Sequence, residues 1–107
     1  TEPLGIKDLN VLPNPFSPLT GPADISFTLT SDQTPTPEVT LKIYNMVGDL
    51  VRTLVDAQLK PRGENIIQWD GTTDYGKMAM NGRYVLHLQV KDISGTKAKL
   101  KPFVLIK

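Results

Sequence analysis

A two-residue alternation of apolar and polar side chains runs through this chain and favours a fold built from β-strands. Residues 24–30, 38–44 and 83–90 each follow this pattern, whereas helical periodicity is nearly absent. Successive side chains of a strand point to opposite faces, so each run predicts a strand with one buried face. The residues expected in the core are Ile25, Phe27, Leu29, Val39, Leu41, Ile43, Tyr84, Leu86, Leu88 and Val90.

Four further runs complete the expected set of strands: 9–12, 50–55, 65–69 and 97–106. Residues 51–59 carry a partial helical stripe, but their β-branched residues favour a strand. About seven strands in a chain of 107 residues predict an all-β fold. We expect an antiparallel β-sandwich of the immunoglobulin-like or fibronectin III-like type.

The run 97–106 is expected to bury one face and to expose the face that carries lysines. The lysines would then discourage edge-to-edge aggregation. Pro102 cannot donate a backbone hydrogen bond, so this run is expected either to lie at a sheet edge or to break at Pro102. The face predicted to be buried holds Ala98, Leu100, Val104 and Ile106, and the exposed face holds Lys97, Lys99 and Lys101.

Turn-forming residues separate the expected strands, and the length fits one domain. We therefore expect a single Ig-like domain over residues 1–107, with residues 1–8 as a linker from a preceding domain. The chain starts at Thr1 without a signal peptide, which is typical of a module from a longer protein. The expected turns and loops are Thr34–Pro37, Met46–Asp49, Asp70–Gly71, Asn81–Gly82 and Ser94–Gly95.

Composition excludes several classes of site. The chain has no Cys, so it forms no disulfide and offers no thiolate to a metal. With 12 basic and 11 acidic residues the net charge is +1, and we expect no nucleic-acid partner. No apolar run approaches the ~20 residues that span a bilayer, so we expect no membrane insertion.

Residue patterns for catalysis are also missing from the sequence. His87 is the single histidine and falls on the polar face of a predicted strand. A histidine needs a partner within hydrogen-bond reach to act as an acid or base. No serine lies in a nucleophile-elbow sequence and no phosphate-binding glycine pattern occurs. We therefore expect no enzymatic activity and no cofactor.

The stretch from Trp69 to Lys77 is the richest in polar side chains. Asp70 and Asp74 with the oxygens between them could hold Ca²⁺, but the loop lacks the further acidic ligands of an EF-hand. The simpler interpretation is that both aspartates form turns in which Gly71 and Gly76 adopt positive φ.

Exposed aromatic rings are the usual platform for sugars. Trp69 alternates with Ile67 and is expected in the core. Tyr75 is then the candidate for an exposed ring, and carbohydrate binding through it is an alternative function.

Three stretches, taken in order, resemble the Ig-like domain of flagellar hook-capping proteins (FlgD type). They resemble still more its relatives at the C-termini of large secreted bacterial proteins. The resemblance covers residues 9–107. It is carried by Asn14-Pro15-Phe16, by Ile43-Tyr44-Asn45 with Gly48, and by Trp69-Asp70-Gly71 with Gly76, Gly82 and Tyr84.

This resemblance implies a non-catalytic module of an extracellular or surface protein that is exported through the periplasm. In some bacteria, similar domains direct cargo through the type IX secretion system and help to attach it to the cell surface. The implied partners are secretion or attachment machinery, or neighbouring domains of the parent protein. The alternative is a structural spacer or an accessory module, such as a carbohydrate-binding one, of a secreted hydrolase.

Overall fold

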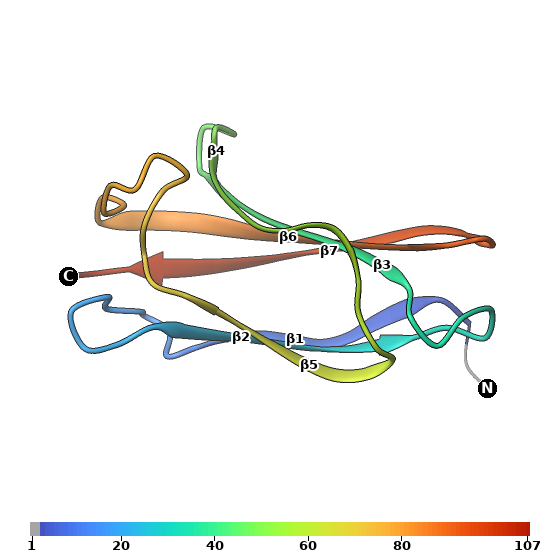
Figure 1. The fold of residues 1–107 in the computed structure, drawn as a ribbon. Coiled ribbons are helices and arrows are strands. Elements are labelled where there is room, and N and C mark those ends of the chain that lie inside the picture. The colour runs from blue at the N-terminus through green and yellow to red at the C-terminus, as the bar shows by residue number, and fades with distance from the viewer. Residues whose placement is uncertain (1–2) are drawn as a thin grey trace.

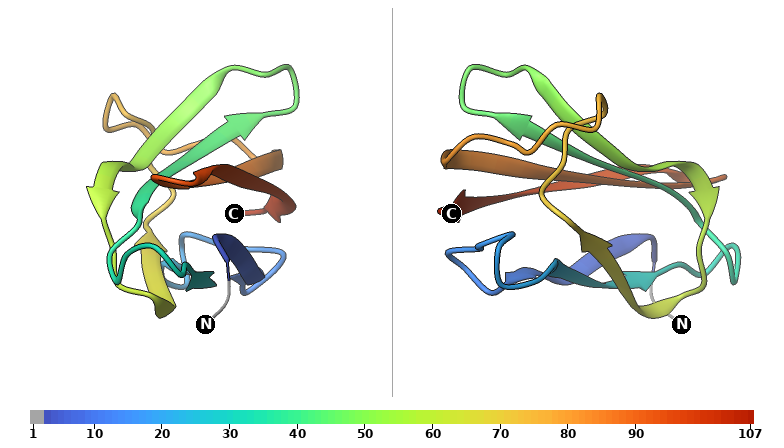
Figure 2. Two further views of the ribbon diagram at one scale, coloured as in Figure 1. Left: turned by 90° about the vertical axis from the view of Figure 1, so that its right-hand side faces the viewer. Right: turned by 60° about the vertical axis from the view of Figure 1, so that its left-hand side comes forward.

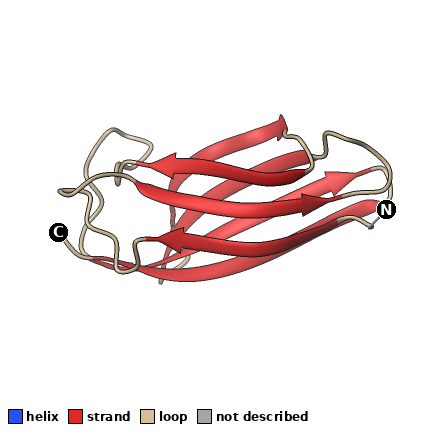
Figure 3. Cartoon of the chain, turned by 90° about the horizontal axis from the view of Figure 1, so that it is seen from below, coloured by secondary structure: helices blue, strands red, loops and turns tan. Residues whose placement is uncertain are grey.

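A computed structural model describes residues 3–107 as seven β-strands joined by turns and loops (Figures 1 and 3). The strands form a three-stranded sheet in the order β1-β2-β5 and a four-stranded sheet in the order β4-β3-β6-β7. All neighbours within each sheet are antiparallel, which confirms the predicted sandwich. The strands are β1 (Gly5–Leu12), β2 (Ala23–Thr30), β3 (Glu38–Asn45), β4 (Leu50–Leu59), β5 (Gly63–Trp69), β6 (Gly82–Asp92) and β7 (Gly95–Leu105).

The core lies between the two sheets, which stack face to face (Figure 2). All ten residues that the alternation of β2, β3 and β6 assigned to the core are buried, with exposed fractions of 6% or less. Alternate residues of these strands face outward and remain partly accessible, so the one-sided burial of each strand follows directly from the sequence pattern.

The first strand is longer than the predicted run 9–12. It begins at Gly5, and Ile6 pairs with Leu29 of β2. Residues 5–8, expected in a linker, therefore belong to the sheet, while residues 1–2 of that linker lie outside the described part. A β-bulge at Asp8, with φ of 54°, puts Ile6 and Leu9 on the same buried face although they are three residues apart. This bulge breaks the alternation that would have revealed the strand.

The face assignment of the last strand was wrong. Tyr84 pairs with Phe103, and Leu88 pairs with Lys99. Directly paired residues share a face of the sheet, so Phe103 and Leu105 point into the core. The lysines at 97, 99 and 101 lie on this same face of β7. The four residues predicted to be buried lie on the opposite face, where Val104 is half-buried and Ala98, Leu100 and Ile106 are exposed. Both phases of this run contain apolar residues, and only the register with β6 selects between them.

Of the two alternatives for Pro102 the structure shows the first, because β7 is an edge strand that continues through Pro102 to Leu105. Strand β4 extends to Leu59, beyond the predicted end at Val55, and contains a bulge at Ala57 with φ of 49°. The backbone amide of Ala57 donates to Oγ1 of Thr40 across this bulge. No helix that could cross a bilayer occurs in residues 3–107.

An odd number of strands places the start of β1 and the end of β7 at opposite ends of the sandwich (Figure 1). The described chain measures 42 × 23 × 19 Å along its principal axes. The end near the C-terminus also holds the loops before β2 and before β6. The other end holds the β6–β7 hairpin tip. These two ends differ strongly in how they are packed.

Candidate functional site

An aromatic cluster closes the C-terminal end of the core. The indole of Trp69, the last residue of β5, lies 5.6 Å from the ring of Phe16 and 5.9 Å from that of Phe103. Tyr84 packs edge-on against Trp69 and stacks on Phe103. Two of the sequence motifs, Asn-Pro-Phe and Trp-Asp-Gly, are therefore brought together through Phe16 and Trp69.

The Asn14-Pro15-Phe16 segment is fastened to the end of β7. The amide of Phe16 donates to the carbonyl of Val104, and the amide of Ile106 donates to the carbonyl of Phe16. Oδ1 of Asn14 accepts a further hydrogen bond from the amide of Val104. The peptide bond before Pro15 is cis. This segment thus extends the four-stranded sheet locally and inserts Phe16, which is fully buried, into the core.

Tyr84 ties the start of β6 to the preceding loop. Its hydroxyl donates to the carbonyl of Met80, four residues upstream. The same arrangement, known as a tyrosine corner, occurs in immunoglobulin-like sandwiches. Burial raises the pKa of the Tyr84 phenol. Gly82, with φ of 153°, lies between the two residues and allows the chain to turn into the strand.

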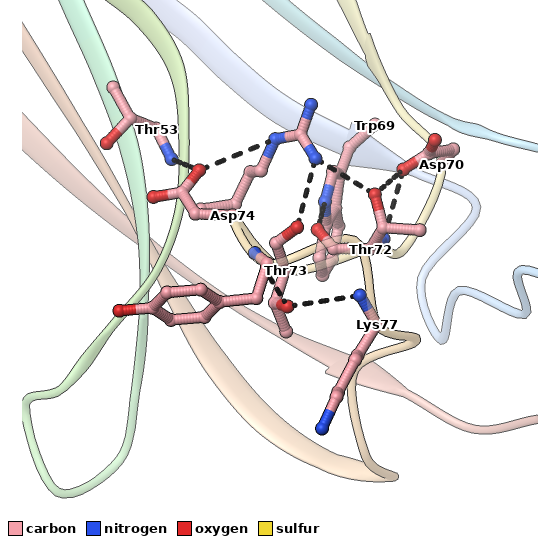
Figure 4. A network of polar contacts seen from close by, with 9 residues as sticks. Thr53, Trp69, Asp70, Thr72, Thr73, Asp74 and Lys77 are labelled. Atoms are coloured by element: carbon pink, nitrogen blue, oxygen red, sulfur yellow. Dashed lines mark hydrogen bonds and ion pairs between the residues drawn. The ribbon is translucent and has the colours of Figure 1, made fainter.

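The Trp-Asp-Gly loop is organised around Asp70 (Figure 4). Oδ1 of Asp70 accepts from the amide of Thr72 at 3.0 Å and from its hydroxyl at 2.6 Å, which is an Asx-turn. These bonds, first that from the hydroxyl, lower the pKa of Asp70, and Arg52 adds a smaller Coulombic contribution. Nε1 of Trp69 donates to the carbonyl of Thr72 at 2.9 Å, so the same turn holds the core indole.

Arg52 of β4 joins this loop to the other sheet. Its Nη1 donates to Oγ1 of Thr72 at 2.9 Å and to the carbonyl of Thr73 at 3.2 Å. Its Nε lies 3.8 Å from Oδ1 of Asp74, which also accepts from the amide of Thr53. Asp74 therefore fastens the loop to β4 and forms no turn of the Asp70 type.

The guanidinium of Arg52 contacts Asp74 and donates to the Thr72 hydroxyl that is bonded to Asp70, so its positive charge would repel a cation bound by these aspartates. Among residues 3–107, no three His, Cys, Asp or Glu side chains gather as a metal site would require. Gly71 and Gly76 have the positive φ that the turn interpretation predicted, 89° and 80°, although Asp70 forms an Asx-turn and Asp74 does not. The loop geometry thus fits a structural clasp better than a calcium site.

Gly71 also lies where a side chain would not fit. A Cβ atom at this position would approach Cβ of Pro18 to 2.8 Å and Sδ of Met78 to 3.1 Å. Gly76 has a similar φ but faces open space. Close packing against Pro18 explains why glycine follows Asp70.

The Ile43-Tyr44-Asn45 motif ends β3, where Asn45 pairs with Tyr84 of β6, and it starts the turn into β4. Ile43 is buried in the core, whereas Tyr44 lies on the outer face with its ring edge-on to His87 at 6.2 Å. Oδ1 of Asn45 accepts from the amides of Val47 and Asp49. Gly48, with φ of 91°, completes the turn into β4. The motif is a core residue followed by a turn former.

A hollow of about 540 Å³ lies beside the Trp-Asp-Gly loop. Its lining includes apolar side chains and the two cations Lys77 and Arg83, without an Asp or Glu; the apolar residues are Val51, Tyr75, Met78, Ala79, Met80 and Tyr84. Tyr75 is 91% exposed, as predicted for an exposed aromatic ring. The hollow suits an anionic group that has an apolar neighbour, but it offers one exposed ring rather than the stacked pair that sugars favour.

Two residues that matter here were missed in the sequence. Arg52 showed no clustering with other charges, because its partners lie about 20 positions away in the chain. Phe103 fell on the wrong face, although its two-residue spacing from Leu105 was a usable signal for a buried pair.

Comparison with known proteins gives one family. The model of the FlgD Ig-like domain matches residues 14–95. No curated protein matches the chain. Among solved structures, dimeric latent PorU from Porphyromonas gingivalis matches 99% of this chain with a TM-score of 0.78 at 24% identity. PorZ, an essential bacterial surface component of the type-IX secretion system of the same organism, matches 92% with a TM-score of 0.57 at 22% identity.

Both structural likenesses show the fold. This chain spans only a tenth of the PorU chain and 11% of the PorZ chain, so each match concerns one module of a much larger protein.

Proposed function

Since this chain belongs to the FlgD Ig-like domain family, we propose that it is a non-catalytic module of a large extracellular bacterial protein, where it serves in secretion sorting or cell-surface anchoring. The observation that carries the proposal is the likeness, over nearly the whole chain, to modules of PorU and PorZ, the latter a surface component of a type-IX secretion system. Its partners would then be secretion or attachment proteins.

The side chains of the candidate site support a non-catalytic role. The polar groups of the Trp-Asp-Gly loop bind one another, and Arg52 is engaged with Thr72, Thr73 and Asp74. His87 lies on the outer face of the four-stranded sheet, where its ring packs against Tyr44. These residues stabilise the fold and leave the surface around them for contact with other proteins.

Export of the parent protein in a bacterium with a type IX system tests the sorting role. We expect the parent protein without this module to accumulate in the periplasm, and the intact protein to reach the surface. A matched control replaces the module with an unrelated Ig-like sandwich of similar size, which should also fail to be exported. Normal export of the truncated protein would falsify the proposal.

A spacer role is the second candidate, and the placement of the chain ends favours it. The start of β1 and the end of β7 lie at opposite ends of a body 42 Å long, so neighbouring domains would be held apart (Figure 1). The same deletion separates the two roles. A spacer or accessory module leaves export unchanged and lowers the stability or the substrate targeting of its neighbour. Affinity electrophoresis in polysaccharide gels tests the carbohydrate-binding form of this role, and migration unchanged in every gel would exclude it.

A further inference from the structure

The four edge strands of this sandwich differ in how they are protected. Strands β1 and β5 form the edges of one sheet, and β4 and β7 form those of the other. An edge strand exposes backbone donors and acceptors that can pair with another chain. Proteins block such pairing with bulges, prolines, inward-pointing charges or covering segments. Three of the four edges carry these devices.

Strand β7 is blocked along its length. Lys97, Lys99 and Lys101 point to the core side, opposite Val90, Leu88 and Leu86 of β6. A strand added here would bring its own inward side chains against this row of charges. Pro102 lacks a donor, and the Phe16 segment already pairs with the end of the strand.

Strands β1 and β4 are interrupted by irregular backbone. Asp8 forms a bulge in β1, and Ala57 forms one in β4. The edge of β4 is also occupied near its start, where the carbonyl of Val51 accepts from the amide of Asp74 and the amide of Thr53 donates to the Asp74 carboxylate. A regular ladder with another chain cannot run along either edge without rearrangement.

Within residues 3–107, strand β5 has none of these devices. It pairs with β2 over seven consecutive residues without a register shift, and it contains no proline. On its outer face Ile66 is 58% exposed, flanked by the exposed side chains of Glu64 and Gln68. On its inner face Ile67 packs against the core but is only partly buried.

We infer that β5 is a pairing edge for a second copy of this chain, joined antiparallel about a two-fold axis through Ile66. In this register Ile66 faces Ile66 of the other copy, and Glu64 faces Gln68. This register opposes no like charges, and the side-chain amide of Gln68 in one copy can donate to the carboxylate of Glu64 in the other. The two sheets would join into one continuous sheet in the order β1-β2-β5-β5-β2-β1, as an isologous contact requires. This pairing does not depend on the proposed role in secretion.

Cysteine crosslinking tests the register, because the chain has no native Cys. At the two-fold axis the Cβ atoms of paired residues lie about 4.5–5.5 Å apart, close to disulfide geometry. We expect Ile66→Cys to form a covalent dimer under mild oxidation. The matched control is Leu100→Cys, an exposed outward position on the blocked edge β7, and it should stay mostly monomeric. Neither Glu64→Cys nor Gln68→Cys should crosslink alone, whereas the double variant should.

Sedimentation of the whole chain tests the association itself. We expect the unmodified chain to shift toward the dimer as its concentration rises to about 1 mM, the range of weak contacts. Ile66→Lys opposes two positive charges and should abolish this shift, while Leu100→Lys should leave it intact. Both positions are more than half exposed, so both variants should fold, which thermal unfolding checks.

A chain that stays monomeric at the highest concentration overturns the proposal and leaves β5 to an extended segment of a different protein or to solvent. A dimer that survives Ile66→Lys, or equal crosslinking through Leu100→Cys and Ile66→Cys, overturns it as well.

Discussion

The two ends of β6 and β7 show how much the same pair of strands depends on what packs against it. At the C-terminal end, Tyr84 and Phe103 pack with Trp69 of the opposite sheet and with Phe16. At the other end, the hairpin tip exposes Ile93, and β7 is accessible on both faces from Gly95 to Leu100. Pairing between the two strands is continuous throughout. Stability should therefore be concentrated at the aromatic end.

The hairpin tip is fastened instead by a few polar bonds. Oδ1 of Asp92 accepts from the amide and the hydroxyl of Ser94, and Oδ2 accepts from the hydroxyl of Ser31 after β2. Ser31 is buried, and its carbonyl accepts from Arg62. Such bonds are each worth less than burial of a large ring. Substitutions that weaken one end at a time can therefore test this difference.

Trp69→Ala should produce the largest loss. It removes a side chain that is 1% exposed and contacts three other rings, and it opens a cavity between the sheets. We expect the free energy of unfolding to fall by about 3–5 kcal/mol in urea titrations. Tyr75→Ala, which removes a ring that is 91% exposed, is the control and should change it by less than about 0.5 kcal/mol. Comparable losses in the two variants would contradict the concentration of stability at this end.

Gly71→Ala should rank second. The new methyl group would lie 2.8 Å from Cβ of Pro18 while the backbone keeps a φ of 89°. Strain and displacement together should lower the free energy of unfolding by about 2–4 kcal/mol. Gly76→Ala has nearly the same backbone strain but no clash, so it should lose about 1 kcal/mol. The difference between the two variants isolates the packing against Pro18. Equal losses would mean that Pro18 yields freely.

The sequence predicted the centre of this fold because β2, β3 and β6 keep a strict alternation. Failures occurred where the alternation was broken or ambiguous. A bulge at Asp8 hid the first half of β1, and apolar residues in both phases of β7 hid the inward position of Phe103. The candidate site was foreseen as motifs but not as a cluster. Contacts such as Phe16 with Trp69, or Arg52 with Asp74, join distant segments, and no local pattern marks them.

Ser31→Ala should have a smaller effect, confined to the hairpin end. It removes the donor to Asp92 and an acceptor for the amides of Gln33 and Thr34. We expect a loss of about 1–2 kcal/mol, since the site is buried and those groups lose a partner. Amide hydrogen exchange should become faster in the hairpin and in residues 31–34. The amides around Trp69 should still exchange only through global unfolding. Equal acceleration at both ends would show that the sandwich opens only as a whole.

Acidification should weaken the hairpin anchor with the least effect on global stability. The bond from the Ser94 hydroxyl, and next that from Ser31, lower the pKa of Asp92 below its ordinary value of 3.8. The folded state therefore holds the Asp92 proton less tightly than the unfolded state does. The resulting stabilisation is complete above the pKa of the unfolded state and is lost as the pH falls through the pKa of the folded state.

At the aromatic end, Asp70 gives a pH dependence of stability in the same direction, because the hydrogen bonds from Thr72 lower its pKa too. Asp92→Asn should flatten the pH dependence of hydrogen exchange in the hairpin below pH 3.8, and it should leave the pH dependence of Trp69 fluorescence unchanged. Asp70→Asn should flatten the pH dependence of Trp69 fluorescence and leave that of hairpin exchange unchanged. If either substitution flattened both signals, the two ends would have to be coupled through β6 and β7 rather than held separately.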